Sequence, residues 1–312
     1  MTHHPVVLFA FNRPVHLSRT LAALAQNHGA QNTQLIIYCD GPKQSSDRQS
    51  IDDSRQVART CIGFGDVKVI EREKNLGLSN SIITGVSEQL EKFEQIIVLE
   101  DDMVTSQFFL QYMNKALNFY QKDDRVISIH GYTYPVQTAL PETFFLRGAD
   151  CWGWATWRRG WSHFNPDGAY LLQQLTKYHL LSEFDLDGAF SFSKMLRDQI
   201  KGLNDSWAIR WHASAFLENK LTLYPGRSLV HNIGNDASGT HTLFSGQYDV
   251  SISSSPIGAT QIAVEQSETA RDIIKDYFYQ TNKLEDNRKR MKHHYVQAKR
   301  MISTLFYLPF QR

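Results

Sequence analysis

Hydrophobic residues follow two alternating patterns along residues 6–129. Short, continuously apolar runs are typical of strands buried on both faces of a parallel sheet, and longer segments with apolar residues every three or four positions are typical of amphipathic helices. The first pattern predicts strands at residues 6–11, 34–39, 67–70, 95–99 and 126–129. The second predicts helices that carry Leu17, Leu21 and Leu24 or span residues 47–62, 78–90 and 108–120. This alternation predicts an α/β fold with a mostly parallel sheet and helices on both faces.

Polar clusters follow three of the predicted strands, at residues 12–14, 40–43 and 100–102. Ligands of parallel sheets bind beyond the carboxyl ends of the strands, where the connecting loops begin. All three clusters fall at such ends, so the pattern predicts a ligand site at that edge of the sheet.

The pattern is less regular in the second half of the chain. Residues 144–165 are rich in aromatic side chains, and residues 170–220 have mainly helical periodicity. Residues 225–260 are rich in Gly, Ser, Thr and Asn, which predicts a region dominated by loops. Residues 267–304 have the pattern of a long helix, so we expect a C-terminal helical extension.

The composition narrows the function classes. The chain has 312 residues, 42% of them hydrophobic and 21% charged, which is typical of a soluble globular protein. Its 33 Lys and Arg nearly balance 32 Asp and Glu, which argues against a dedicated nucleic-acid binder. Three cysteines without a paired spacing argue against a disulfide framework or a Cys-rich zinc site, and favour a reducing compartment.

The charge is uneven along the chain. Residues 286–312 contain seven basic residues and one acid, a net +6, which leaves the preceding residues at −5. The chain ends in the apolar run 305–310, and this combination suits the surface of an anionic membrane. The alternative is a solvated helix whose last turn docks on the body. The apolar run 5–11 is too short for a signal peptide, and no run is long enough to span a bilayer, so we expect a cytoplasmic protein, at most peripheral to the membrane.

Three consecutive acids, Glu100, Asp101 and Asp102, follow the apolar strand 95–99. Their carboxylates repel one another, and a divalent cation such as Mn²⁺ or Mg²⁺ would relieve that repulsion. Such a cation bridges carboxylates to a diphosphate and stabilises it as a leaving group. The alternative is a solvated turn, or a helix start where acids favour the dipole.

Four motifs in order, FNRP after the first strand, IIYCDGPK, KNLGLSNSI and IIVLEDDM, resemble the nucleotide-sugar half of GT-A glycosyltransferases. The EDD form of the acidic motif resembles that of N-acetylglucosaminyltransferase I and its bacterial relatives. The resemblance is strong over residues 5–135 and weaker over 144–242. It implies a GT-A fold with a nucleotide-sugar-binding half at residues 1–135, a donor-sugar and acceptor half at 136–265, and a basic helical tail at 266–312.

The resemblance also implies roles for the acidic motif and the first two loops. Asp102 would be the direct Mn²⁺ ligand, Asp101 would lie near the ribose and donor sugar, and Glu100 would hydrogen-bond the donor sugar or support the loop. The loop that contains Arg13 would hold uracil and ribose together with Asp40, and its neighbours Phe11 and Asn12 would line the same site. Asp40 as a turn residue and Arg13 as a solvent-facing helix start are the alternatives.

In the KNLGLSNSI motif, the resemblance places Asn75, Gly77 and Asn80 at the nucleotide. The glycine permits close approach of the backbone to a ligand. The alternative is a plain loop followed by a helix cap at Ser79 or Asn80.

All six tryptophans lie between residues 152 and 211. Trp154, Trp157 and Trp161 are spaced so that a helix would place them on one face, a stripe that is typical of core. The resemblance implies that Trp152 or Gly153 forms a wall of the donor-sugar site, and we expect Trp157 and Trp161 in the core. We also expect at least two of the six to line the cleft.

An inverting transfer needs a base that takes the proton of the acceptor hydroxyl. Asp205 resembles the family's acid at the start of a helix, although one acid stands here instead of two. Alternatively, Asp205 caps a helix that begins at Ser206, a role that is compatible with catalysis. Asp236 and Asp150 are the reserve candidates for the base. A polar, glycine-rich loop further along carries His231 and His241, either of which would reach the metal or phosphate, or remain a surface residue.

These features predict a metal-dependent, inverting glycosyltransferase that moves N-acetylglucosamine or a related hexose from a UDP-sugar to a hydroxyl of a surface glycan or glycolipid. The same-fold alternative is a nucleotidyltransferase, but such enzymes have a glycine-rich loop after the first strand, and residues 12–14 contain no glycine. The other alternative is a non-catalytic carbohydrate-binding protein derived from a transferase.

Overall fold

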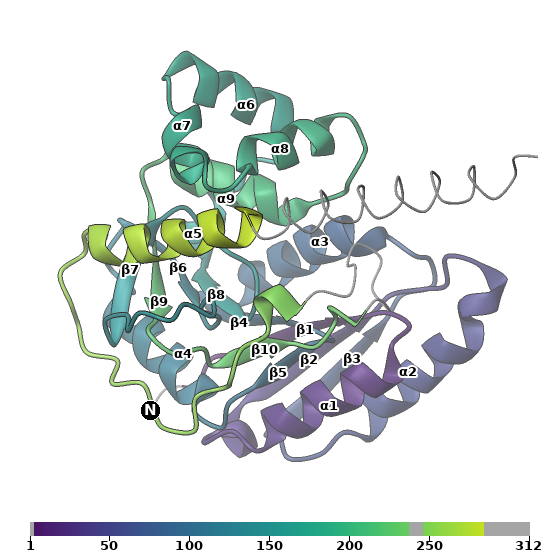
Figure 1. Cartoon of the computed structure of the whole chain (residues 1–312). Helices are drawn as coiled ribbons and strands as arrows, with labels where there is room; N and C mark the ends of the chain where they lie inside the picture. The colour runs from purple at the N-terminus through teal and green to yellow at the C-terminus, as the bar shows by residue number, and fades with distance from the viewer. Residues whose placement is uncertain (1–2, 237–245, 284–312) are drawn as a thin grey trace, which may run out of the picture.

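A computed structural model describes residues 3–236 and 246–283 (Figure 1). All five strands predicted in the first half are present, with bounds close to the expected ones: β1 (Val6–Ala10), β2 (Gln34–Cys39), β3 (Asp66–Glu71), β4 (Gln95–Glu100) and β6 (Val126–His130). The four predicted helices lie between them: α1 (Pro14–Ala25), α2 (Arg48–Thr60), α3 (Gly77–Lys92) and α4 (Phe109–Phe119).

One eight-stranded sheet runs through both halves of the chain. Its order is β3-β2-β1-β4-β8-β6-β9-β7, where β7 is Thr143–Arg147, β8 is Trp154–Trp157 and β9 is Leu221–Pro225. The first four strands are parallel, and β6 and β9 run the same way, whereas β8 and β7 are antiparallel to their neighbours. The sheet is therefore mostly parallel, as predicted.

Helices cover both faces of this sheet. Along β1, Leu8 packs into a core with α1, α2 and α4, while its neighbour Phe9 packs into a second core on the opposite face with α3. Because side chains alternate between faces along a strand, a strand covered on both faces must be apolar throughout. This explains the continuous apolar runs in the sequence.

The second half adds a helical layer at one end of the molecule (Figure 1). It consists of α6 (Gly168–Lys177), α7 (Leu181–Phe184), α8 (Phe192–Ile200) and α9 (Trp207–Leu217), as the periodicity of residues 170–220 predicts. Residues 268–283 are helical and bury Ala270, Ile274 and Phe278 against the sheet. The start of the predicted tail therefore packs on the body, and its basic part, residues 286–312, lies outside the described residues.

The tryptophan stripe is not helical, contrary to the prediction. Trp154 and Trp157 lie on strand β8, and Trp161 ends the short helix α5 (Arg158–Trp161). Trp157 and Trp161 are buried, as expected for core residues. Pairing with β4 and β6 fixes Ala155 opposite Ile97 and Ile129, and these long-range contacts outweigh the local helical spacing.

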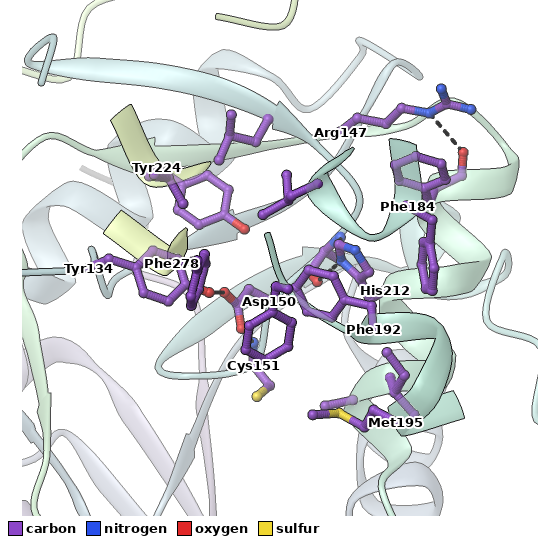
Figure 2. Close-up of a pocket in the computed structure, with 18 of the residues that line it drawn as sticks. Tyr134, Arg147, Asp150, Cys151, Phe184, Phe192, Met195, His212, Tyr224 and Phe278 are labelled. Atoms are coloured by element: carbon purple, nitrogen blue, oxygen red, sulfur yellow. Dashed lines mark hydrogen bonds between the residues drawn. The ribbon is translucent and has the colours of Figure 1, made fainter. Parts of the chain in front are cut away.

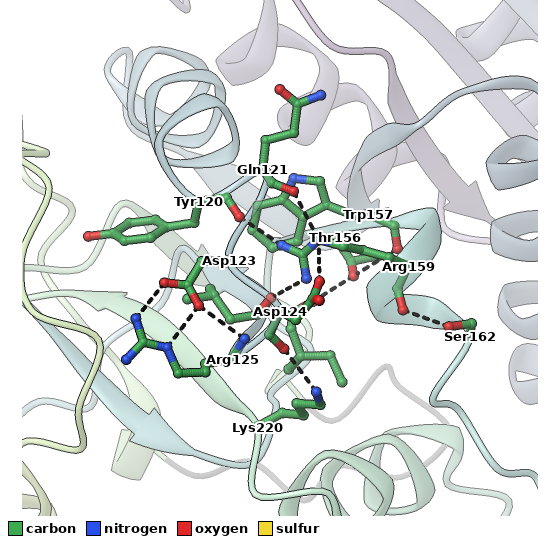
Figure 3. A network of polar contacts seen from close by, with 12 residues as sticks. Tyr120, Gln121, Asp123, Asp124, Arg125, Thr156, Trp157, Arg159, Ser162 and Lys220 are labelled. Carbon is green, nitrogen blue, oxygen red and sulfur yellow. Dashed lines mark hydrogen bonds and ion pairs between the residues drawn. The ribbon is translucent and has the colours of Figure 1, made fainter.

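Arg159 ties the loop before β6 to the end of β8 (Figure 3). Its guanidinium donates hydrogen bonds to the carbonyl oxygens of Tyr120 at 2.7 Å, Val126 at 2.8 Å and Gln121 at 3.0 Å. It also lies over the ring of Trp157, 4.4 Å from the centroid. These contacts satisfy backbone carbonyls at the point where the two halves of the sheet join.

Within residues 3–236 and 246–283, none of the helices has the length and apolar character that crossing a membrane requires.

Candidate active site

The polar clusters meet at one edge of the sheet, as the pattern predicts. Strands β2, β1 and β4 are adjacent, with Ala10 opposite Cys39 and Phe9 opposite Glu100. The loops that follow these strands therefore begin side by side. This edge brings the motifs around residues 11–13, 40–41 and 100–102 together.

Arg13 lies against the acidic motif. Its Nη2 atom is 2.5 Å from Oδ1 of Asp101 and 2.7 Å from Oδ2 of Asp102. Asp101 is fixed further by the backbone N–H of Phe11, which donates to Oδ2 at 3.3 Å, and by Thr20, whose hydroxyl donates to the Asp101 carbonyl oxygen at 2.8 Å. Asn12 is half-buried in the same loop. The predicted donor-binding loop and the acidic motif thus form one cluster.

The cluster carries more negative charge than Arg13 balances. Burial raises the pKa of Glu100 to about 8, and the neighbouring carboxylates of Asp102 and Asp101 add to this shift. Burial also raises the pKa of Asp101 to about 6, although Arg13 acts in the opposite direction. Burial disfavours the charged form of Arg13, but the two carboxylates outweigh it and raise its pKa. A bound cation would relieve this excess of carboxylates.

Asp102 has one oxygen without a partner. Its Oδ1 atom is buried and accepts no hydrogen bond, an arrangement that costs free energy unless a cation or donor occupies the site. The described residues contain no cluster of three or more His, Cys, Asp or Glu side chains that would hold a metal alone. The residues present therefore fit a divalent cation held by Asp102 and completed by oxygens of a ligand or water.

The loop after β10 (Val230–Asn232) packs directly on Asp102. Strand β10 pairs with β5 (Met103–Thr105), and the Ile233 N–H donates to the Asp102 carbonyl oxygen at 2.9 Å. A Cβ at Gly234 would overlap Oδ2 of Asp102, so any larger residue there would displace the Asp102 carboxylate. The sequence did not single out Gly234; its position in a polar, glycine-rich loop was the available signal.

Of the two candidate histidines of this loop, the structure describes only His231, whose ring has other partners. The Nδ1–H of His231 donates to the carbonyl oxygen of Val250 at 2.9 Å, and Nε2 lies 3.7 Å from Oδ1 of Asp249. His241 lies outside the described residues. The reserve acid Asp236 lies 3.1 Å from His16 and is exposed.

Asp40 is buried and organises the KNLGLSNSI loop. Its carboxylate accepts hydrogen bonds from the backbone N–H of Leu76 at 3.1 Å and of Gly41 at 3.1 Å. Asn75 donates to the Gly41 carbonyl oxygen at 2.9 Å and accepts from the Gly77 N–H at 3.0 Å. Burial raises the pKa of Asp40, against the effect of these hydrogen bonds. Asp40 is therefore more than a simple turn residue.

Asp205 faces the same loop from the second half of the chain. An added Cβ on Gly77, which has φ of +75°, would lie 3.8 Å from Oδ2 of Asp205. Ser206, and not Asp205, caps α9, because its hydroxyl accepts from the Ile209 N–H at 3.2 Å. The Asp205 carboxylate is 59% exposed and lies 4.0 Å from Arg210. The alternative of a capping role for Asp205 is wrong, and its carboxylate faces solvent beside the KNLGLSNSI loop.

Asn80 and Ser79 do not cap α3 in the expected way. The Asn80 side chain donates back to the Leu76 carbonyl oxygen at 3.2 Å and is otherwise exposed. Ser79 is buried and accepts from Arg210 at 2.5 Å. The Arg210–Ser79 contact joins α9, which follows Asp205, to the start of α3.

Trp152 and Gly153 lie directly before strand β8. Gly153 has φ of +64°, and its carbonyl oxygen accepts from the Gly131 N–H at 2.7 Å. The Trp152 backbone N–H donates to Nε2 of the buried His130 at 3.1 Å. The Trp152 ring meets Tyr132 edge-on, with centroids 4.8 Å apart. The positive φ of Gly153 lets the chain turn from Trp152 into β8.

A cavity of about 340 Å³ opens beside Trp152 (Figure 2). Figure 2 shows Asp150 between Tyr134 and Cys151, facing Phe192 and His212 across the cavity. Of the six tryptophans, all within the described residues, Trp152 alone lines this cavity. The other five are buried, and Trp154, Trp161, Trp207 and Trp211 pack on one another. The sequence did not identify this cavity, because its wall comes from segments between residues 132 and 278.

The family model for glycosyl transferase family 2 matches residues 6–182. No curated protein matches the sequence. Similar solved structures include S. aureus TarS 1-349 in complex with UDP-GlcNAc, at 11% identity and a TM-score of 0.33, covering 50% of this chain and 46% of that one. Mouse xyloside xylosyltransferase 1, in its apo form, has 14% identity and a TM-score of 0.36, covering 57% and 76%. The chain thus spans about half the length of the TarS chain.

Proposed function

The chain belongs to glycosyl transferase family 2 and is a glycosyltransferase of the GT-A type, and on that premise we propose that it transfers a hexose, N-acetylglucosamine or a related sugar, from a UDP-sugar to a hydroxyl of a glycan or glycolipid. The transfer depends on Mn²⁺ or Mg²⁺ and inverts the anomeric centre. Family membership favours sugar transfer over the nucleotidyl transfer considered above.

The observation that carries this proposal is the cluster of Arg13, Asp101 and Asp102 at the carboxyl edge of the sheet. One buried Asp102 oxygen has no partner, and the surrounding acids exceed the local positive charge. Asp102 would hold the cation, with Asp101 beside it. Such a cation supplies positive charge to a diphosphate leaving group.

The remaining residues bind and orient the donor. Asp40 accepts a hydrogen bond from the imide N–H of uracil, while Asn75 and Gly77 shape the loop against the nucleotide. Arg13 offers a guanidinium to the ribose or phosphates, and Glu100 hydrogen-bonds the donor sugar. Trp152 and Gly153 form a wall for that sugar, because an aromatic face packs well on the C–H face of a pyranose.

Asp205 is the proposed general base. Its exposed carboxylate lies beside Gly77 and does not cap α9. It would accept the proton of the acceptor hydroxyl as that oxygen attacks the anomeric carbon. Asp150 is the second candidate, because it faces the cavity next to Trp152.

The decisive experiment measures hydrolysis and nucleotide binding with UDP-, GDP- and dTDP-sugars, with and without Mn²⁺. We expect hydrolysis only with UDP-sugars in the presence of metal. The Asp102→Asn variant should lose both hydrolysis and metal-dependent nucleotide binding. Arg19→Gln, at an exposed position on α1, is the matched control. Absence of both turnover and metal-dependent binding across the panel would refute the proposal and favour a non-catalytic carbohydrate-binding protein.

A further inference from the structure

We propose that the cavity beside Trp152 is an acceptor subsite for an apolar group, so that the acceptor is an amphiphile with its hydroxyl next to an aryl or alkyl moiety. This inference rests on the proposed function and specifies its acceptor. The volume of about 340 Å³ falls within the range of small-molecule sites.

The wall of the cavity is apolar and largely aromatic. The rings come from the sheet, from the helical layer and from the helical residues 268–283, and they include Tyr134, Phe184, Phe190, Phe192, Tyr224 and Phe278. Leu186, Ile274 and Met195 fill the spaces between them. An apolar group bound here removes its own surface and that of the cavity wall from water, which favours binding in proportion to the area buried.

Apart from Asp150, the charged side chains that line the cavity already have partners. Arg147 donates to Glu183 at 3.0 Å and to the Phe216 carbonyl oxygen at 2.9 Å. Arg271 donates to Asp187 at 3.0 Å. A sugar in this space would need many hydrogen bonds that these engaged groups do not offer, and unmet polar groups are costly. An apolar occupant avoids that cost.

Asp150 marks the polar end of the cavity. One of its oxygens accepts from the Tyr134 hydroxyl at 3.1 Å and the other from the Cys151 N–H at 2.8 Å. A carboxylate oxygen accepts two hydrogen bonds, so Asp150 retains capacity for a hydroxyl of the acceptor. The cavity therefore has one carboxylate that can accept a hydrogen bond, at the end of an otherwise apolar interior.

Two of the segments that line the cavity lead directly into residues of the candidate active site. Trp152 lines it and is adjacent in sequence to Gly153 at the sheet edge, while Ser206 lines it and follows the proposed base Asp205. An acceptor whose apolar group fills the cavity would thus present its hydroxyl between these two segments. This placement favours the acceptor, and not the nucleotide, as the occupant.

The test is calorimetric titration of methyl, butyl, hexyl and phenyl β-glucosides into the full chain with UDP and Mn²⁺. We expect the affinity to rise about fourfold per methylene from methyl to hexyl, the factor for a fully buried methylene, and phenyl to bind more tightly than methyl. Equal affinity for the methyl and hexyl glucosides would overturn the proposal and indicate an acceptor recognised through its sugar alone.

Two variants locate the binding. Met195→Trp places a large ring in the cavity and should abolish the dependence on chain length. Leu203→Trp, at a position 72% exposed and outside the cavity, should retain it. A length dependence that persists in a folded Met195→Trp protein would also overturn the proposal. Titration of UDP and Mn²⁺ without glucoside, on the same samples, reports the donor site separately, so loss of the donor function is distinguishable from loss of the cavity function.

Discussion

The Nη2 atom of Arg13 lies 2.7 Å from Oδ2 of Asp102, the residue best placed to hold a divalent cation. A guanidinium so close to a carboxylate neutralises part of the charge that a cation would otherwise meet. The proposed metal ion would therefore compete with Arg13 for the Asp102 carboxylate, and removing Arg13 should strengthen the binding of the ion.

Arg13→Gln should bind Mn²⁺ more tightly than the natural chain in the absence of nucleotide. Loss of one charge-assisted contact to the metal-binding carboxylate predicts a gain of about five- to tenfold in affinity. Calorimetric titration with Mn²⁺ measures the change, with Arg19→Gln at an exposed position on α1, the helix that follows Arg13, as control. An unchanged or weaker affinity would show that Arg13 does not oppose the cation.

Asp205→Asn should lower kcat by about 10²- to 10⁴-fold with little change in KM for the donor, because the amide cannot accept the proton of the acceptor hydroxyl. Asp150→Asn should instead raise KM for an amphiphilic acceptor, since it retains shape but weakens one hydrogen bond. Steady-state kinetics of both variants separate the roles. The reverse pattern, a large fall in kcat for Asp150→Asn alone, would identify Asp150 as the base.

Asp40→Asn should reduce the preference for UDP over CDP. In the proposed complex the carboxylate would accept from the uracil imide N–H, whereas an amide would also donate to the unprotonated ring nitrogen of cytosine. We expect the ratio of the two affinities to fall by about tenfold or more, measured by competition binding. If the ratio is unchanged while the melting temperature falls, Asp40 serves only to hold the Leu76 and Gly41 backbone.

Stability should decline in acid through His130. Burial lowers the pKa of this fully buried imidazole below its ordinary value of 6.5, although Asp150 acts in the opposite direction. The unfolded chain then binds a proton that the folded chain resists, so stability is complete above pH 6.5 and is lost as the pH falls below it. Denaturant unfolding should show a loss of up to about 1.4 kcal/mol per pH unit from this residue.

His130→Gln is the matched variant for this test. Its side-chain oxygen can still accept the Trp152 N–H but does not titrate, so the acid sensitivity should be smaller than in the natural chain. An identical pH dependence in both proteins would assign the loss to other groups.

The fold of the first half follows from local pattern. Each strand of the parallel layer is apolar on both faces because helices cover both, and runs such as Val6–Ala10 therefore stand out in the sequence. Strand β8 does not stand out in this way. Its Trp154 and Trp157 fit a helix face equally well. Pairing with β4 and β6, more than 20 residues away in sequence, makes this segment a strand.

The acidic motif was predictable because three acids directly after a buried strand have few structural explanations. The cavity was not, because Asp150, Phe192 and Phe278 come together only through tertiary packing. The sequence did not predict the role of Gly234 either. A side chain at this position would displace the Asp102 carboxylate, and Asp102 lies more than 100 residues earlier in the chain. Residues that act through local sequence were thus predictable, and residues assembled from distant segments were not.

The antiparallel strand β8, inserted between β4 and β6, has a consequence for biosynthesis. When the ribosome has made the first 135 residues, β4 has no partner on its outer edge, and β6 lacks both of its neighbours, β8 and β9. Such edges invite association with other nascent chains. Residues 1–135 should therefore require chaperone protection until about residue 225 has emerged, and an isolated fragment of these residues should aggregate.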